Sequence, residues 1–296
     1  MSQPRIATFA RLANGSVAPT RIITGQTTRL GRTIHGIAYN AVRDEIVTVN
    51  PLAAAILSFR GGASGDEAPL RVIQGSNTHL ILPHAASVDP QNKEIIVGDR
   101  ESQIVVFSDA ANGNVAPVRL LRGPKTKLAF VVGTAVDPVR NLLLVANTGP
   151  GSIGILIFNR TDTGDVAPKG MISGPKTGIT YPWEVRVAGD KIFVGGTNSD
   201  YAMPYDRGEN HPRAALTKVP LSPWRSDTLG FIGVWNITDM GDVPPRAVIR
   251  GPVSGLVHPT GVALDPEHGE VMASDSVRNG VFTFLVPDLF KPSNER

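Results

Sequence analysis

The chain has 296 residues, 41% hydrophobic and 19% charged, which excludes a disordered chain and suits one large domain or two small ones. Lysine and arginine number 29 against 26 aspartates and glutamates, so nucleic-acid binding is not indicated. Without cysteine, disulfides and thiolate metal ligands are excluded. No apolar stretch is long enough to span a membrane and no signal peptide is evident, so we expect a soluble protein, either cytoplasmic or secreted.

Two short motifs recur along the chain at the same intervals. The first, Gly-x-x-Ala-Pro or a close variant, begins at Gly15, Gly65, Gly113, Gly164 and Gly241. The second, Gly-x-x-Thr-x-Leu or a close variant, begins at Gly25, Gly75, Gly123, Gly174 and Gly251. Both series are therefore spaced by 50, 48, 51 and 77 residues. Two markers with one set of intervals indicate a structural repeat.

Each repeat holds four short apolar runs, bounded by Gly, Asn or Asp-Pro, which are typical of strands and not of helices. We label them a to d. In chain order the expected strands are 5–9 and 21–24; 36–39, 46–49, 56–59 and 71–74; 85–88, 95–97, 104–107 and 118–121; 133–136, 142–146, 153–158 and 170–173; 184–187, 192–195, 231–235 and 247–250; and 261–264, 271–274 and 281–285. Four strands in about 49 residues predict a β-propeller blade.

The sequence thus predicts an all-β fold, a β-propeller of five four-stranded blades forming a single domain over residues 1–296. A long insertion at about 199–228 separates strands b and c of the fourth blade. The strand at 21–24 is expected to close the propeller by joining the C-terminal blade. Residues 5–9 form a sixth c strand, which leaves three options: an additional outer strand, a strand for self-association with another chain, or part of a sixth blade. Six blades are therefore the alternative.

The runs at 262–266 (VALDP) and 271–275 (VMASD) resemble the NHL-type repeat, and 142–147 (LLLVAN) resembles the related YVTN-type repeat. The resemblance covers nearly the whole chain through blade-forming positions. It implies a propeller but no particular activity, because this class includes partner-binding modules, lactonases and lyases.

The repeated motifs themselves are expected to be structural. The first is predicted to form the c–d turn, with Gly at positive φ and Pro at fixed φ. The second connects strand d to strand a. There the Thr is expected to bond loop backbone, and the Leu to pack between blades.

Polar residues end strand b in every repeat, at Asn50, Asp99, Asn147, Asn198 and Asp275. Carboxylate and amide oxygens suit Ca²⁺, and the gluconolactonase-like propellers hold a divalent ion in their channel. We therefore treat Asn50, Asp99, Asn147 and Asp275 as candidate metal ligands. The alternative is that these side chains bond nearby backbone N–H groups in turns. No cofactor is expected other than one Ca²⁺ or other divalent ion.

His35 and His84 precede two neighbouring a strands, at the expected mouth of the channel. They are the candidate catalytic residues, as general bases or metal ligands, and the alternative is a structural pair. The fourth a strand carries Glu184 and Arg186 where the others have small residues. They either form an ion pair or contact a ligand.

Aromatic and Arg residues gather in the fourth blade and its insertion, as in many binding surfaces. The candidate ligand-binding residues are Tyr181, Trp183, Glu184, Arg186, Tyr201, Tyr205, Arg207, Trp224 and Arg225. They favour a non-catalytic binding or scaffolding propeller that holds a protein segment or a glycan. The alternative is a metal-dependent lactonase-like hydrolase or lyase that uses His35 or His84.

Overall fold

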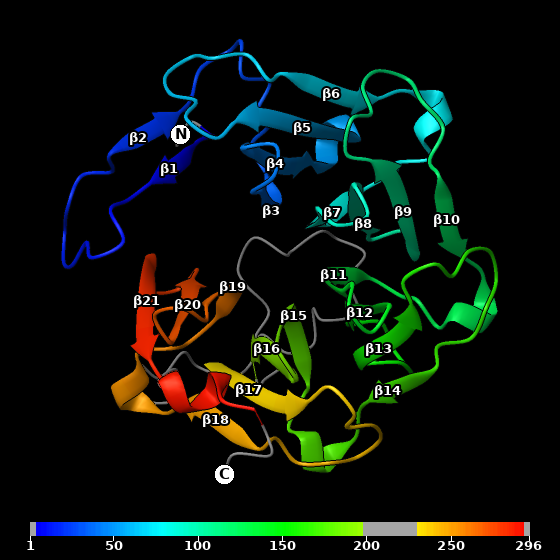
Figure 1. Cartoon of the computed structure of the whole chain (residues 1–296), viewed down its shortest axis with the longest axis vertical. Coiled ribbons are helices and arrows are strands. Elements are labelled where there is room, and N and C mark those ends of the chain that lie inside the picture. The colour runs from blue at the N-terminus through cyan, green and yellow to red at the C-terminus, as the bar shows by residue number, and fades with distance from the viewer. Residues whose placement is uncertain (1–3, 198–229, 293–296) are drawn as a thin grey trace, which may run out of the picture. The chain divides into compact units, whose positions relative to one another are not determined.

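The computed structural model describes residues 4–197 and 230–292 and shows an all-β fold, a β-propeller with five blades (Figure 1). Contacts divide the chain into two compact units, each described by itself. The first comprises Met1–Leu142 and Arg160–Ala167, and the second Leu143–Asn159 and Pro168–Arg296. Within the described residues, no helix has the length and apolar character needed to cross a membrane.

Every expected strand is present, and strands that neighbour each other in a sheet follow one another along the chain. The four-stranded sheets are β3–β6 (His35–Asn40, Glu45–Asn50, Ala55–Arg60, Arg71–Gln74), β7–β10 (Pro83–Asp89, Glu94–Asp99, Gln103–Ser108, Arg119–Arg122), β11–β14 (Val131–Asp137, Leu142–Asn147, Gly154–Asn159, Gly170–Ile172) and β15–β18 (Tyr181–Ala188, Lys191–Thr197, Gly230–Asn236, Ala247–Arg250). The last sheet, β19–β21 (Pro259–Asp265, Glu270–Asp275, Gly280–Leu285), has three strands, and β1 (Ile6–Thr8) and β2 (Arg21–Ile23) form a two-stranded sheet. The insertion lies between β16 and β17, outside the described residues.

The N-terminal strands differ from the expected closure. β2 was expected to pair with the last blade, but it pairs with β1, and Ile6 lies opposite Ile23 as Ile56 lies opposite Ile73. β1 therefore occupies the edge of β2 that a d strand normally offers to the c strand of its blade. Residues 5–9 were expected to form an outer strand, a strand for self-association or part of a sixth blade. The structure shows β1 paired with β2 of the same chain in a separate two-stranded sheet. Self-association through them stays a prediction.

The repeated motifs form a clasp between consecutive repeats. The Gly residues of the first motif have φ between 66° and 81°, as expected for the c–d turn. An Asp or Asn follows this Gly in the last four copies of the motif. Its Oδ1 accepts a backbone N–H from the second motif of the preceding repeat, as Asp165 does from Lys125 at 2.7 Å. A Cβ on Gly123 would lie 2.4 Å from the Asp165 side chain, so this close approach requires glycine.

The Thr of the second motif is buried and holds its own loop. Thr126 Oγ1 donates to the Gly123 carbonyl at 2.6 Å and accepts from the Leu128 N–H at 3.2 Å, and Thr28, Thr78 and Thr177 do the same. The following Leu, or the Ile in the fourth repeat, is buried. Both structural expectations for this motif are confirmed.

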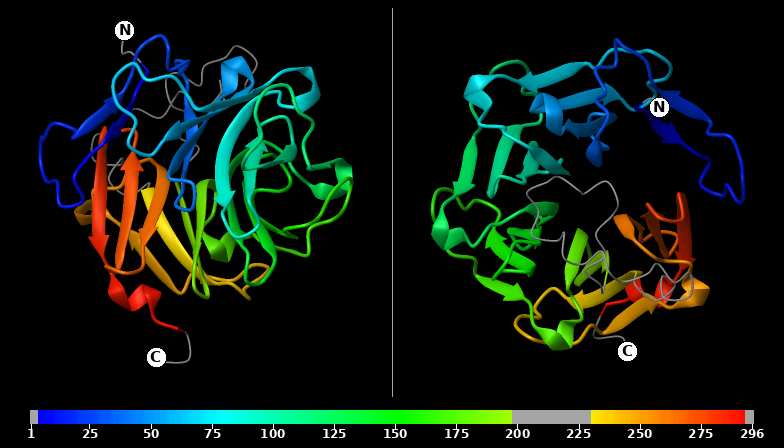
Figure 2. Two further views of the ribbon diagram at one scale, coloured as in Figure 1. Left: turned by 45° about the horizontal axis from the view of Figure 1, so that its top comes forward. Right: turned by 180° about the vertical axis from the view of Figure 1, so that it is seen from behind.

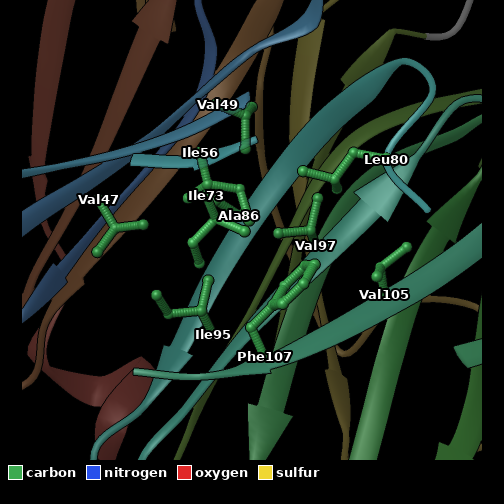
Figure 3. Close-up of a cluster of buried hydrophobic side chains, with 10 residues drawn as sticks. All are labelled: Val47, Val49, Ile56, Ile73, Leu80, Ala86, Ile95, Val97, Val105 and Phe107. Atoms are coloured by element: carbon green, nitrogen blue, oxygen red, sulfur yellow. The ribbon is translucent and has the colours of Figure 1, made fainter. Parts of the chain in front are cut away.

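The core lies between neighbouring sheets. In the first unit, apolar side chains from β4–β6 face those from β7–β9, and Ile56, Ile73, Ile95 and Phe107 are at most 1% exposed (Figure 3). Because apolar side chains of neighbouring sheets bury one another in this way, the repeat itself supplies hydrophobic driving force for folding.

A buried ion-pair network, which the sequence analysis did not anticipate, also joins strands of the first unit. Arg119 forms a two-pronged bond with Glu94, at 2.7 Å for each oxygen, and Arg160 reaches the same carboxylate at 2.7 Å. Burial opposes ionisation of Glu94, but the two guanidinium groups outweigh it and lower its pKa.

Candidate functional site

The predicted site residues fall into both units and into the undescribed segment. The first unit contains His35, His84, Asn50 and Asp99, and the second contains Tyr181, Trp183, Glu184, Arg186, Asn147 and Asp275. Tyr201, Tyr205, Arg207, Trp224, Arg225 and Asn198 lie outside the described residues.

The first strand of a sheet carries a β-bulge near its start in at least four blades. The register shifts across Gly36 in β3, His84 in β7, Trp183 in β15 and Thr260 in β19. A bulge leaves one residue unpaired and re-aims its side chain, and it is common beside functional sites. Two of the predicted site residues, His84 and Trp183, are the bulged residues themselves.

An aromatic cluster lies at the starts of β15 and β19 in the second unit. The ring centroid of Trp183 is 5.1 Å from that of Tyr181 and 5.1 Å from that of His258, which meets it edge-on. Tyr181 and His258 are buried, at 6% and 2% exposure, whereas Trp183 is partly exposed. The two buried rings therefore hold the Trp183 indole in one orientation at the surface.

Asp275 supports this cluster from the end of β20. Its Oδ2 accepts the backbone N–H groups of Val257 and His258, both at 2.7 Å, and its Oδ1 accepts those of Val277 and Arg278. Two of these donors fix the loop that carries His258, and the other two fix the turn that follows β20. Asp275, a predicted metal ligand, thus orients the aromatic cluster through His258.

Glu184 and Arg186 project from the same side of β15 and form an ion pair of 2.7 Å between Oε1 and Nη1. Glu184 is 9% exposed, and burial raises its pKa to about 7 against the opposing influence of Arg186 and the Val185 N–H. The ion pair that we expected as one alternative is present. The carboxyl group of Glu184 therefore gains and loses its proton near neutral pH.

In the first unit His35 and His84 stack, with ring centroids 4.0 Å apart and an angle of 22° between the planes. His84 is 4% exposed, and its pKa lies well below the ordinary value because of burial, then His35 and Arg100. A neutral His84 donates Nδ1–H to the Val132 carbonyl at 3.2 Å. The two predicted catalytic histidines are thus together.

The other candidate metal ligands cap corners of the chain. Asn50 Nδ2 donates to the Arg29 carbonyl, and Asn147 Nδ2 donates to Ser152. Asp99 accepts the N–H groups of Ile81, Leu82 and Glu101, as Asp275 does at the matching positions of its repeat. Among residues 4–197 and 230–292, no group of three or more His, Asp or Glu side chains is arranged to hold a metal ion.

The sequence analysis missed His258 and the pair formed by Arg100 and Phe130, in which the guanidinium lies 3.7 Å from the ring centroid. A signal was present. His258 and Phe130 occupy the place of Tyr181 when the repeats are aligned on their second motif, so the signal lies in the residues two positions before the bulge.

Comparison with protein-family models finds none that matches the chain, and comparison with curated proteins finds no significant match. The β-propeller fold is compatible with binding or scaffolding.

Proposed function

We propose that this protein is a binding β-propeller of the NHL/YVTN type that holds a protein segment at the aromatic cluster of Tyr181, Trp183 and His258. The observation that carries the proposal is the fixed, partly exposed Trp183 ring between two buried rings. Trp, Tyr and Arg dominate interface hot spots because they bury large areas at small entropic cost. Rigid support by Asp275 reduces that cost further.

The Glu184–Arg186 pair, which lies on the same strand as Trp183, supplies polar recognition in this proposal. Arg186 is partly exposed, with 24% of its side chain accessible, so it can reach an acceptor on a ligand while Glu184 fixes its position. The predicted residues in the 199–228 insertion belong to the same proposal, on sequence evidence alone.

Peptide and glycan arrays test the proposal and separate its two ligand classes. We expect discrete peptide sequences to bind the wild-type protein and to lose binding to Trp183→Ala. Tyr39→Ala is the matched control, because Tyr39 is an exposed aromatic side chain in the other unit. Glycan binding that depends on Trp183 would change the ligand class, and peptide binding that ignores Trp183 would refute the site.

A lactonase-like hydrolase or lyase is the second candidate, because His35 and His84 stack and His84 stays neutral near pH 7. A neutral imidazole serves as a general base or a ligand to a divalent ion. Mass spectrometry of metals in the purified protein, before and after a chelator, tests it. About one ion per chain together with lactone turnover would favour this function over binding.

A further inference from the structure

The last sheet places a serine hydroxyl against a histidine ring. His258 directly precedes β19, and Ser276 begins the turn between β20 and β21, which are the orange to red strands of Figure 2. The Ser276 Oγ lies 2.8 Å from His258 Nδ1 and 3.4 Å from the His258 carbonyl oxygen. Because O–H···O bonds are about 2.5–3.0 Å long, the ring nitrogen is the better acceptor for the single hydroxyl proton. The imidazole accepts this proton in the tautomer that carries its own proton on Nε2.

The side chains of this pair, and not its backbone, distinguish the last repeat. In the second sheet, Leu82 and Arg100 hold the matching places. There the Arg100 N–H donates to the Leu82 carbonyl at 3.1 Å. In the last sheet the Ser276 N–H donates to the His258 carbonyl at 3.1 Å. The backbone bond therefore forms without a hydroxyl or an imidazole, so the needs of the turn do not explain the contact between Ser276 and His258.

The surroundings of the pair suit a nucleophile and its base. Ser276 is exposed, so a substrate can reach its oxygen, whereas His258 is 2% exposed and largely shielded from water. The Trp183 ring meets the imidazole edge-on and limits its rotation. Asp275 holds the backbone on both sides of the pair, because it accepts the N–H groups of His258 and Val277. Asp275 is therefore a positioning residue for both members of the pair.

We propose that Ser276 is a nucleophile and His258 its general base in the hydrolysis of carboxylic esters. Ser276 Oγ bonds to the ester carbonyl carbon while its proton passes to His258 Nδ1. The bond from that carbon to the leaving oxygen then breaks, and His258 returns the proton to the leaving alkoxide. Water attacks the acyl-serine in the same way and releases the carboxylic acid and the free Ser276 hydroxyl.

This activity goes beyond peptide binding and differs from the metal-dependent reaction considered for His35 and His84. Its steps use only an ester and water, so they need no oxidant, reductant or metal ion. The partly exposed ring of Trp183 contacts His258. Esters with an aromatic group are therefore the expected substrates, because that group can pack on the indole.

Labelling with a biotin-linked fluorophosphonate, followed by peptide mass spectrometry, tests the nucleophile. We expect about one equivalent of label on Ser276 of the full-length wild type and no label at this turn in Ser276→Ala. Ser274→Ala is the matched control, because Ser274 is an exposed serine of the same sheet, and it should keep the label on Ser276. A wild type without label on Ser276 overturns the proposal.

Hydrolysis of p-nitrophenyl acetate tests the base. General-base catalysis contributes about 10²–10⁴-fold, so we expect at least about a hundredfold slower acetylation in His258→Gln than in the wild type, with the fold intact by circular dichroism. Ser276→Ala, at an exposed position, should reduce hydrolysis to the uncatalysed rate. An unchanged rate in either variant overturns the proposal, and so does loss of turnover in the presence of EDTA. Ser276→Ala should still bind peptides, so failure of this proposal and failure of the binding function are distinguishable.

Discussion

Glu184 provides the sharpest prediction about energetics, because its pKa is raised from 4.5 to about 7 by burial. Below pH 4.5 the carboxyl group is protonated in both the folded and the unfolded chain and has no effect. As pH rises from 4.5 to 7, only the unfolded chain loses the proton, so the free energy of unfolding falls. Above pH 7 the penalty is complete, and a shift of this size corresponds to about 3 kcal/mol.

Glu184→Gln mimics the protonated side chain and cannot ionise. We therefore expect this variant to match the wild type near pH 4.5 and to be more stable by up to about 3 kcal/mol at pH 8. Urea unfolding at both pH values, followed by circular dichroism, measures the difference. Glu267→Gln, at an exposed glutamate of the same unit, is the control.

A Glu184→Gln variant that is no more stable than the wild type at pH 8 would refute the effect of burial on Glu184. That result would mean that the ion pair with Arg186 holds Glu184 charged, and that burial does not control its protonation. A stabilisation equal at both pH values would point to a packing effect, with no contribution from titration.

Three further outcomes follow from buried polar groups. Thr126→Val leaves the Gly123 carbonyl without its hydroxyl donor and should lower the free energy of unfolding in urea by about 1–3 kcal/mol. Thr126→Ser keeps the hydroxyl and should be nearly neutral. Equal losses in both variants would contradict the role of the hydroxyl. Glu94→Ala removes the carboxylate that Arg119 and Arg160 share, while Arg160 keeps its longer ion pair of 3.7 Å with Asp89. The loss should cost about 3 kcal/mol, and a cost below about 1 kcal/mol would disprove the role of Glu94. The pKa of His84 is lowered in the folded chain, so the free energy of unfolding falls as pH drops below 6.5 and the unfolded chain takes up a proton there. In the Glu184→Gln background, His84→Gln should reduce this loss of stability between about pH 7 and pH 5. An unchanged slope would argue against a buried neutral His84.

The blades could be predicted from the sequence because each repeat carries its own signals. The two Gly motifs mark the turns, and the apolar runs between them fit strands of four to six residues. The clasp was harder to foresee, since Asp165 meets Lys125 only after neighbouring repeats pack. The pairing of β1 with β2 was missed because Arg5–Phe9 matches a c strand and the closure rule assigned β2 elsewhere.

The candidate site was predictable in part. Trp183 and His84 could be identified because they stand just before an a strand, at a position that differs between repeats. Glu184 and Arg186 could be identified because they replace the small residues of the other a strands. The stacking of His35 on His84, 4.0 Å apart, needed the packing of β3 on β7. His258 lies 75 residues from Trp183 in sequence, so only the contact between β15 and β19 reveals the cluster.

Isothermal titration calorimetry is the most direct test of peptide binding at Trp183. It measures the affinity of the full chain for a peptide selected on the arrays, for the wild type and for Trp183→Ala. Truncation of a hot-spot ring costs about 2 kcal/mol or more, so we expect at least an approximately thirtyfold weaker affinity in Trp183→Ala and no change in Tyr39→Ala. Equal affinities of the wild type and Trp183→Ala would contradict it and would place the binding surface elsewhere on the propeller.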